Sequence, residues 1–244
     1  MEIIIKHTKN ELGKIAAEYG AKKVSEVIDE KGFANIILAT GASQFEMLDN
    51  LVQQNVEWSK VNCFHLDEYI GLPESHAASF RKYLKERFAH KVNVNSFYFI
   101  KGENNPKQEC KRINEIIKRY PIDVAFIGIG ENGHLAFNDP PADFETEEPY
   151  IIVELDKKCR MQQLGEGWFP NLESVPDKAI SMSIKQILKS KSIICTVPDK
   201  RKAEAVFKTV TAEISPIVPA TILRKHNDTI LFLDRESASF LNKG

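Results

Sequence analysis

Short apolar runs alternate along the chain with longer stretches in which apolar residues recur at helical spacing. The apolar runs predict strands at residues 3–6, 35–38, 61–66, 124–129, 192–197 and 229–233, with a weaker candidate at 97–100. Helical spacing predicts helices over residues 11–27, 45–57, 79–89, 110–119 and 201–211. Strands and helices that follow each other in this way predict an α/β fold.

The expected architecture is an open, mostly parallel, twisted sheet of Rossmann-like type with helices on both faces. A length of 244 residues fits a single domain, 1–244. Residues 139–175 lack clear periodicity and contain several prolines and glycines. An irregular stretch of that length inside a compact domain is typical of a lid or binding segment.

Composition narrows the classes of partner. A formal net charge of -1 gives no field that would attract nucleic acid or an anionic membrane to the whole surface, so an anion site must be local. Cys63, Cys110, Cys159 and Cys195 lie tens of residues apart, which does not predict a zinc site or a redox pair. The first apolar run is too short for a signal peptide or a membrane span, so we expect a cytoplasmic protein.

The loop after the strand at 35–38 has the composition of a phosphate cradle. Thr40, Gly41, Ala42 and Ser43 are small, two of them carry hydroxyl groups, and a helix is predicted to follow directly. Small residues let the backbone approach an anion, and a helix start offers free N–H groups. A plain turn in which Ser43 caps the next helix is an alternative interpretation.

Two adjacent carboxylates, Asp67 and Glu68, follow the strand at 61–66. Neighbouring side chains on an extended chain point to opposite sides, so one can face a pocket while the other anchors the loop. Asp67 is the candidate general base, because a partly buried carboxylate can remove a weakly acidic proton beside a carbonyl. A surface Asx-turn is the alternative.

The loop after the strand at 124–129 brings glycines together with a histidine. Gly130 and Gly133 allow the backbone to bend, and His134 can exchange a proton near neutral pH. Asp139, five residues further on, can return to hold the ring. The glycine spacing does not fit a dinucleotide-binding loop. A histidine with only a structural role is the alternative for this loop.

Together these three segments resemble the family of the glucosamine-6-phosphate deaminases and, more distantly, the 6-phosphogluconolactonases. The resemblance runs from about residue 36 to the C-terminus and is strongest at residues 40–43, 64–72 and 128–140. It implies that Asp67 moves a proton between C2 and C1 of the sugar and that His134 assists ring opening. It also implies that residues 40–43 hold the phosphate together with a lysine at the start of a late helix, here Lys202. A solvated helix start at 200–202 is the alternative.

Several positions depart from the deaminase pattern. Asn132 stands where the family has an aspartate, Asp139 where it has a glutamate, and Ala42 where it has a glycine. Arg160 is the candidate for the family's phosphate-binding arginine, and Trp168 offers a flat face for a sugar ring. The complete predicted site is Asp67, His134, Asp139 and Asn132 for catalysis, with Thr40, Gly41, Ala42, Ser43, Glu68, Gly133, Arg160 and Lys202 for binding the sugar phosphate.

The resemblance implies an enzyme that isomerises and deaminates a hexosamine 6-phosphate without a metal or an organic cofactor. We expect this enzyme to be a hydrolase that acts on an amino sugar phosphate. Glucosamine and galactosamine 6-phosphate both remain open, as does a homo-oligomer. Lactone hydrolysis is the nearest alternative, although residues 135–139 lack the lactonases' Ala-Ser-Leu-Phe-Pro run. A sugar-phosphate sensor is the other alternative. Such regulators carry an N-terminal DNA-binding unit, for which the early first strand leaves no room.

Overall fold

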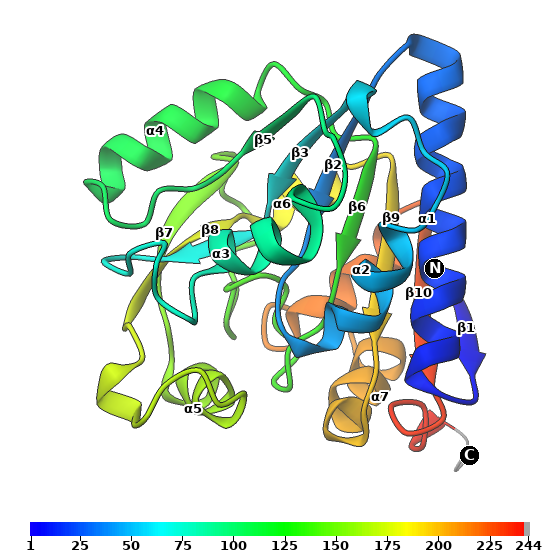
Figure 1. Cartoon of the computed structure of the whole chain (residues 1–244). Coiled ribbons are helices and arrows are strands. Elements are labelled where there is room, and N and C mark those ends of the chain that lie inside the picture. The colour runs from blue at the N-terminus through cyan, green and yellow to red at the C-terminus, as the bar shows by residue number, and fades with distance from the viewer. Residues whose placement is uncertain (242–244) are drawn as a thin grey trace.

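A seven-stranded parallel sheet forms the centre of the molecule in the computed structural model, which describes residues 1–241 (Figure 1). Its strands lie in the order β1-β10-β9-β6-β2-β3-β5. Their bounds are β1 (Glu2–Lys6), β2 (Ala34–Leu38), β3 (Val61–His65), β5 (Ser96–Tyr98), β6 (Val124–Ile127), β9 (Ser192–Val197) and β10 (Thr229–Asp234). The predicted fold class and all seven predicted strands are confirmed.

Helices cover both faces of this sheet. One hydrophobic core cluster joins the strands to α1 (Lys9–Lys31) and α2 (Phe45–Leu51), and another joins them to α4 (Pro106–Ile117), α6 (Ile184–Leu188) and α7 (Ala203–Thr211). In β2 the neighbouring residues Ile36 and Ile37 belong to opposite clusters. Because side chains alternate along a strand, a strand buried on both faces reads as a continuous apolar run.

Local capping explains where helix bounds differ from the sequence-based expectation. α1 is longer than predicted, since the Thr8 side chain accepts from the Glu11 N–H at its start and Gly32 ends it with φ of +85°. α4 begins earlier because Asn105 caps it, with Pro106 in the first turn. The predicted helix at 79–89 is α3 (Phe80–Leu84) followed by a π-helical turn at Lys85–Ala89.

A second, antiparallel sheet was not predicted. It has the order β4-β8-β7, with β4 (Asp67–Tyr69), β7 (Tyr150–Glu154) and β8 (Lys178–Met182), and α5 (Lys157–Gly165) follows β7. The expectation that 139–175 is irregular is therefore wrong for β7 and α5. Short 3-10 helices complete the described chain at Ala42–Gln44, Trp58–Lys60, Leu172–Ser174, Lys200–Lys202 and Pro219–Lys225.

The carboxyl ends of the parallel strands all point to one end of the molecule. β2, β3 and β5 run in chain order towards one edge, whereas β6, β9 and β10 continue on the other side of β2. The order therefore reverses between β2 and β6, and in open α/β sheets such a switch point is where ligands bind. Among residues 1–241, no helix is long and apolar enough to cross a membrane.

Candidate active site

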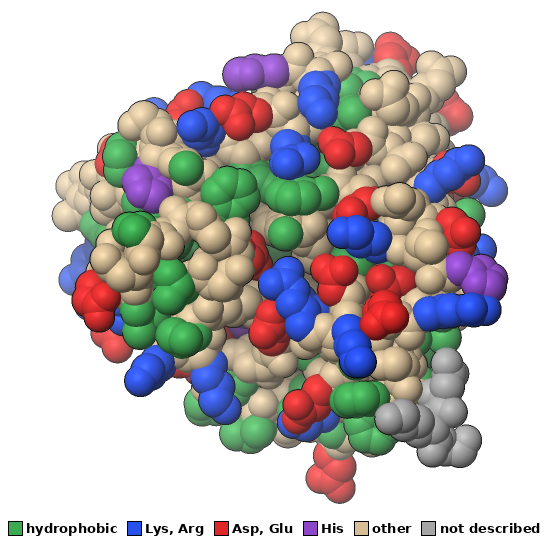
Figure 2. Space-filling view, turned by 60° about the horizontal axis from the view of Figure 1, so that its bottom comes forward, with side chains coloured by type: hydrophobic (Ala, Val, Ile, Leu, Met, Phe, Trp, Pro, Cys, Tyr) green, Lys and Arg blue, Asp and Glu red, His purple; other side chains and the backbone are tan. Residues whose placement is uncertain are grey.

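A cavity opens beyond the carboxyl ends of β2, β3, β6 and β9, next to the point where the strand order reverses. Figure 2 looks onto this end of the molecule, where acidic and basic side chains are interspersed on the surface. The cavity is lined by Ala39, Thr40, Gly41, Ser43, Leu66, Asp67, Phe80, Gly128, Ile129, Gly130, His134, Ala136, Phe137, Gln162, Gln163, Glu166 and Lys202. Segments that are distant along the chain, including Asp67, His134 and the loop at 40–43, thus meet around one space.

The loop after β2 presents two hydroxyl side chains to the cavity. Thr40 and Ser43 both line it, and Gly41 adopts φ of +94°, a conformation that favours glycine. Ser43 lies within the 3-10 helix at Ala42–Gln44 and does not cap α2, whose N-cap Gln44 makes no capping side-chain hydrogen bond. The Tyr83 hydroxyl donates to the Gly41 carbonyl oxygen at 2.9 Å. This hydrogen bond fixes the backbone of the loop at Gly41.

Buried Gln44 ties this loop to β9. Its side-chain amide donates to the Ser43 hydroxyl at 3.2 Å and to the Thr196 carbonyl oxygen at 3.3 Å. Its carbonyl oxygen accepts from the Thr196 hydroxyl at 2.8 Å. A β-carbon on Gly128 would lie 2.8 Å from the Gln44 amide nitrogen, so a larger residue there would press on this link.

Asp67 and Glu68 face opposite ways, as expected for neighbours on an extended chain. Asp67 lines the cavity and is 6% exposed, and burial followed by the charge of Glu68 raises its pKa well above the ordinary value. Glu68 does not line the cavity. Its carboxylate accepts from the Ser79 hydroxyl at 2.9 Å and from the Arg81 N–H at 3.0 Å, and it lies 3.4 Å from the Arg81 guanidinium. The structure thus gives Glu68 the anchoring role and places it away from the predicted sugar phosphate.

The His134 ring lies directly over the loop that carries it. The backbone N–H of Gly130 donates to the His134 carbonyl oxygen at 2.9 Å, and a β-carbon on Gly130 would lie only 2.2 Å from His134 Nε2. Residue 130 must therefore be glycine for the ring to take this position. The structure brings His134 and Asp67 to the same cavity, as the sequence predicts.

Asp139 holds the other side of the His134 ring. Its Oδ1 lies 3.0 Å from His134 Nδ1 and also accepts from the Asn132 side-chain amide at 3.0 Å. Asn132 in turn accepts from the His134 backbone N–H at 3.1 Å. Although burial favours the neutral carboxyl group, these hydrogen bonds keep the pKa of Asp139 below its ordinary value. Asn132 therefore acts on His134 through the backbone and through Asp139.

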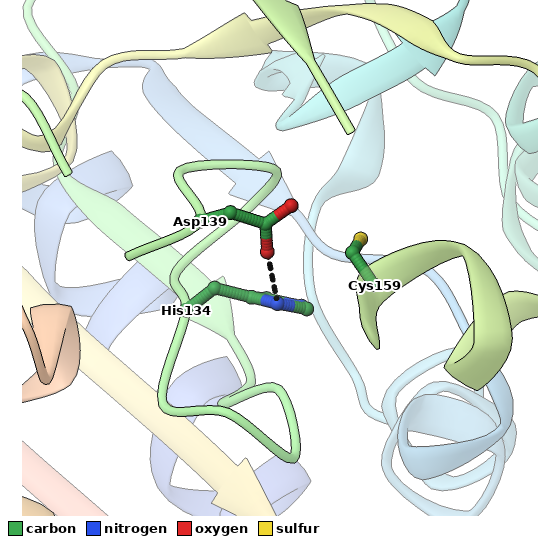
Figure 3. Close-up of side chains that lie close together, drawn as sticks. All are labelled: His134, Asp139 and Cys159. Atoms are coloured by element: carbon green, nitrogen blue, oxygen red, sulfur yellow. Dashed lines mark hydrogen bonds and ion pairs between the residues drawn. The ribbon is translucent and has the colours of Figure 1, made fainter. Parts of the chain in front are cut away.

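Cys159 approaches the same pair from α5 (Figure 3). Ligand atoms of His134, Asp139 and Cys159 all lie within 4.8 Å of one another, a spacing that a metal ion could bridge. Burial, followed by the charge and hydrogen bond of Asp139, raises the pKa of the Cys159 thiol far above its usual range. In this arrangement the Cys159 thiol can donate a hydrogen bond to the Asp139 carboxylate.

Lys202 supplies the positive charge of the cavity. It is 3% exposed, and its ammonium group has no hydrogen-bond or ion-pair partner among residues 1–241. Burial lowers its pKa to about 8, against the smaller opposing effect of Glu131. Its neighbour Arg201 instead lies 3.5 Å from Glu131, and Lys200 is exposed. Of the three candidate cations at 200–202, only Lys202 lines the cavity.

Seven predicted positions lie outside the cavity lining, namely Glu68, Asn132 and Asp139, described above, and Arg160, Gly133, Ala42 and Trp168. The Arg160 guanidinium donates to the carbonyl oxygens of Leu172 and Val175 and so folds the segment after α5. Gly133 shapes its loop with φ of +86°, and Ala42 belongs to the 3-10 helix. Trp168 packs on the cluster around the small sheet.

The sequence interpretation missed three polar residues of the α5 segment that line the cavity, Gln162, Gln163 and Glu166. Gln163 accepts from the Tyr69 hydroxyl at 2.8 Å, and Gln162 accepts from the Glu131 backbone N–H at 3.0 Å. Glu166 makes no comparable contact. The signal that could have revealed them is their spacing of three and four residues, which puts them on one helical face.

Comparison with known proteins places this arrangement in a family. A family model described as glucosamine-6-phosphate isomerases/6-phosphogluconolactonase matches residues 7–232. A glucosamine-6-phosphate deaminase from Clostridium novyi (strain NT) is 38% identical, over 99% of this chain and 100% of its own. One from Streptococcus pneumoniae (strain 70585) is 34% identical, over 92% and 95%.

Solved structures agree with this placement. A structure described as a monomeric glucosamine-6-phosphate deaminase of the NagB superfamily has a TM-score of 0.89 at 32% identity, covering 98% of this chain and 99% of its own. A 6-phosphogluconolactonase from Shewanella baltica OS155 has a TM-score of 0.80 at 17% identity, covering 96% and 97%, which is a likeness of fold. The chain therefore belongs to the family of glucosamine-6-phosphate isomerases and 6-phosphogluconolactonases.

Proposed function

We propose that this chain converts a hexosamine 6-phosphate to a ketose 6-phosphate and ammonia. The observation that carries the proposal is the meeting of Asp67, His134 and Lys202 around one cavity at the switch point of the sheet. A buried carboxylate with a raised pKa suits proton transfer at carbon, and an unpaired buried lysine suits a phosphate. The deaminase names of the full-length relatives support the same reaction.

The phosphate group is assigned to the loop at 40–43 and Lys202. The Lys202 ammonium supplies a point charge, while the Thr40 and Ser43 hydroxyls donate hydrogen bonds. Holding the phosphate at this end fixes which end of the sugar reaches the catalytic groups. The bound phosphate then orients C1 and C2 for the chemistry.

Ring opening is assigned to His134. The imidazole takes the proton of the C1 hydroxyl group and returns it to the ring oxygen, which leaves a free aldehyde at C1. The Asp139 carboxylate, 3.0 Å from Nδ1, directs the ring and leaves Nε2 as the atom that faces the substrate. Asn132 positions Asp139 in this arrangement.

Proton transfer between carbons is assigned to Asp67. The carboxylate removes the C2 proton, which the neighbouring C1 carbonyl makes acidic, and delivers it to C1 through an enol-type intermediate, while one proton of the C2 ammonium group passes to the C1 oxygen. The nitrogen on C2 is then an iminium group. Water adds to this iminium and ammonia leaves, so the sugar phosphate becomes a ketose.

An assay that scores ammonia and ketose phosphate separately tests the proposal. Glucosamine 6-phosphate and galactosamine 6-phosphate are the substrates, and 6-phosphogluconolactone tests for lactone hydrolysis. Asp67→Asn should lower kcat by about 10³-fold, because a general base contributes on the order of 10²–10⁴ to the rate. Full activity in this variant would reject Asp67 as the base. Lactone hydrolysis without ammonia release would reject deamination.

A further inference from the structure

The cavity contains one charged side chain that the proposed mechanism does not use. Glu166 lines the cavity from the end of α5, and its carboxylate has no hydrogen-bond or ion-pair partner among residues 1–241. A half-buried carboxylate that faces a cavity without a protein donor is free to accept a hydrogen bond from a ligand. Neighbouring Gln162 and Gln163 already have partners in the protein, so Glu166 is the free acceptor of the α5 segment.

The backbone aims Glu166 at the phosphate end of the cavity. α5 ends at Gly165, and Gly167 then turns the chain with φ of +83°. Both carboxylate oxygens of Glu166 lie close to Gly41, at 3.7 and 3.9 Å from the place where a β-carbon on that residue would stand. Glu166 also contributes to the field at Lys202, which it tends to keep protonated. Its carboxylate therefore stands beside the phosphate loop.

A hexosamine 6-phosphate bound as proposed above would offer Glu166 a hydroxyl group. In the closed ring of a hexosamine 6-phosphate, C5 carries the phosphate-bearing C6, the hydroxyl group on the neighbouring C4 is the ring hydroxyl nearest to the phosphate ester, and C2 lies across the ring from C5. A carboxylate is a strong acceptor for a hydroxyl group but repels a phosphate. With the phosphate on residues 40–43 and C2 at Asp67, the C4 hydroxyl is the donor that lies in reach of Glu166.

We propose that Glu166 is a specificity-determining residue that accepts a hydrogen bond from the C4 hydroxyl group and so reads its configuration. This inference rests on the proposed function. Glucosamine and galactosamine differ in the direction of this hydroxyl, and only one direction pairs it with the carboxylate. A site built to pair a hydroxyl group penalises a substrate that leaves the site's acceptor unpaired.

The test compares kcat/KM for glucosamine 6-phosphate and galactosamine 6-phosphate in the wild-type protein and in Glu166→Gln. Loss of a charge-assisted hydrogen bond should lower kcat/KM for the preferred epimer by about 10- to 100-fold and bring the ratio of the two epimers towards one. Glu131→Gln is the matched control. Glu131 also raises the pKa of Lys202 but does not line the cavity, so its loss should keep the epimer ratio.

Calorimetric binding of inorganic phosphate separates this role from a structural one. Phosphate should bind to Glu166→Gln at least as tightly as to the wild-type protein, because a negative charge near Lys202 is removed. An unchanged epimer ratio in Glu166→Gln, or an equal change in Glu131→Gln, would overturn the inference. So would a wild-type protein that deaminates both epimers equally well, and this result would leave the proposed deamination intact. Absence of ammonia release from either epimer would instead reject the proposed function.

Discussion

Replacing Gly130 by alanine tests whether the position of the His134 ring matters for the reaction. Gly130 does not have a positive φ, so its backbone conformation admits alanine. The added β-carbon would stand 2.2 Å from His134 Nε2 and 2.3 Å from Cε1. The substitution therefore acts on the ring without removing any chemical group from the cavity.

The size of the effect follows from these distances. An ordinary van der Waals contact begins at 3.4 Å, so the ring must retreat by about 1.2 Å from a β-carbon at 2.2 Å. Its hydrogen bond to Asp139 is 3.0 Å long and does not survive such a movement in the present geometry. Since a displacement of about 1 Å can cost about 10²-fold in rate, we expect kcat to fall by about two orders of magnitude.

The assay is steady-state release of ammonia, together with the melting temperature of each variant. Gly128→Ala is the comparison, because its β-carbon would press on the Gln44 amide and disturb the phosphate-binding loop at 40–43. This variant should raise KM for the sugar phosphate more than it lowers kcat. A kcat of Gly130→Ala within threefold of the wild type, at an unchanged melting temperature, would refute the assigned role of the His134 ring.

Three further predictions concern charge and hydrogen bonding. The Kd of inorganic phosphate should rise above pH 8, where Lys202 loses its proton. Lys202→Arg should abolish this rise, because arginine keeps its charge at that pH. Inorganic phosphate is the probe because the amine of the substrate titrates in the same range. Glu68→Gln should lower the free energy of unfolding in urea by about 2 kcal/mol, because a neutral amide replaces the buried carboxylate that accepts from the Ser79 hydroxyl and the Arg81 backbone N–H. An increased KM at unchanged stability would instead indicate that Glu68 contacts the substrate. Cys159→Ala should lower kcat/KM by about fivefold, because Asp139 loses a hydrogen-bond donor. Cys159→Ser retains a donor and should keep most of the activity. Equal losses of activity in both variants would contradict the hydrogen-bond role of Cys159.

The parallel sheet was predictable because its strands are buried on both faces. β2, β3 and β9 are continuous buried runs bounded by turns, and this pattern leaves few alternatives. The small antiparallel sheet gave no such signal. β4 has only three residues, two of which are the carboxylates Asp67 and Glu68, and its pairing with β8 brings together residues over a hundred positions apart.

The convergence of Asp67, His134 and the loop at 40–43 was also predictable, because loops at the carboxyl ends of neighbouring parallel strands share one edge of the sheet. The direction of individual side chains was not. Arg160 lies on α5, yet its guanidinium binds backbone carbonyl groups of the following segment, a contact that only tertiary packing determines. Glu166 escaped prediction because α5 has few apolar residues with which to mark its inward face.

The link between Thr196, Gln44 and Ser43 has a directional consequence. The Thr196 hydroxyl donates to the Gln44 carbonyl oxygen, and the Gln44 amide donates both to the Ser43 oxygen and back to the Thr196 carbonyl oxygen. Because the Ser43 oxygen already accepts a hydrogen bond from Gln44, the hydrogen of its own hydroxyl group is left to donate to a group in the cavity. An anion that enters the cavity can accept this hydrogen, whereas a cation cannot.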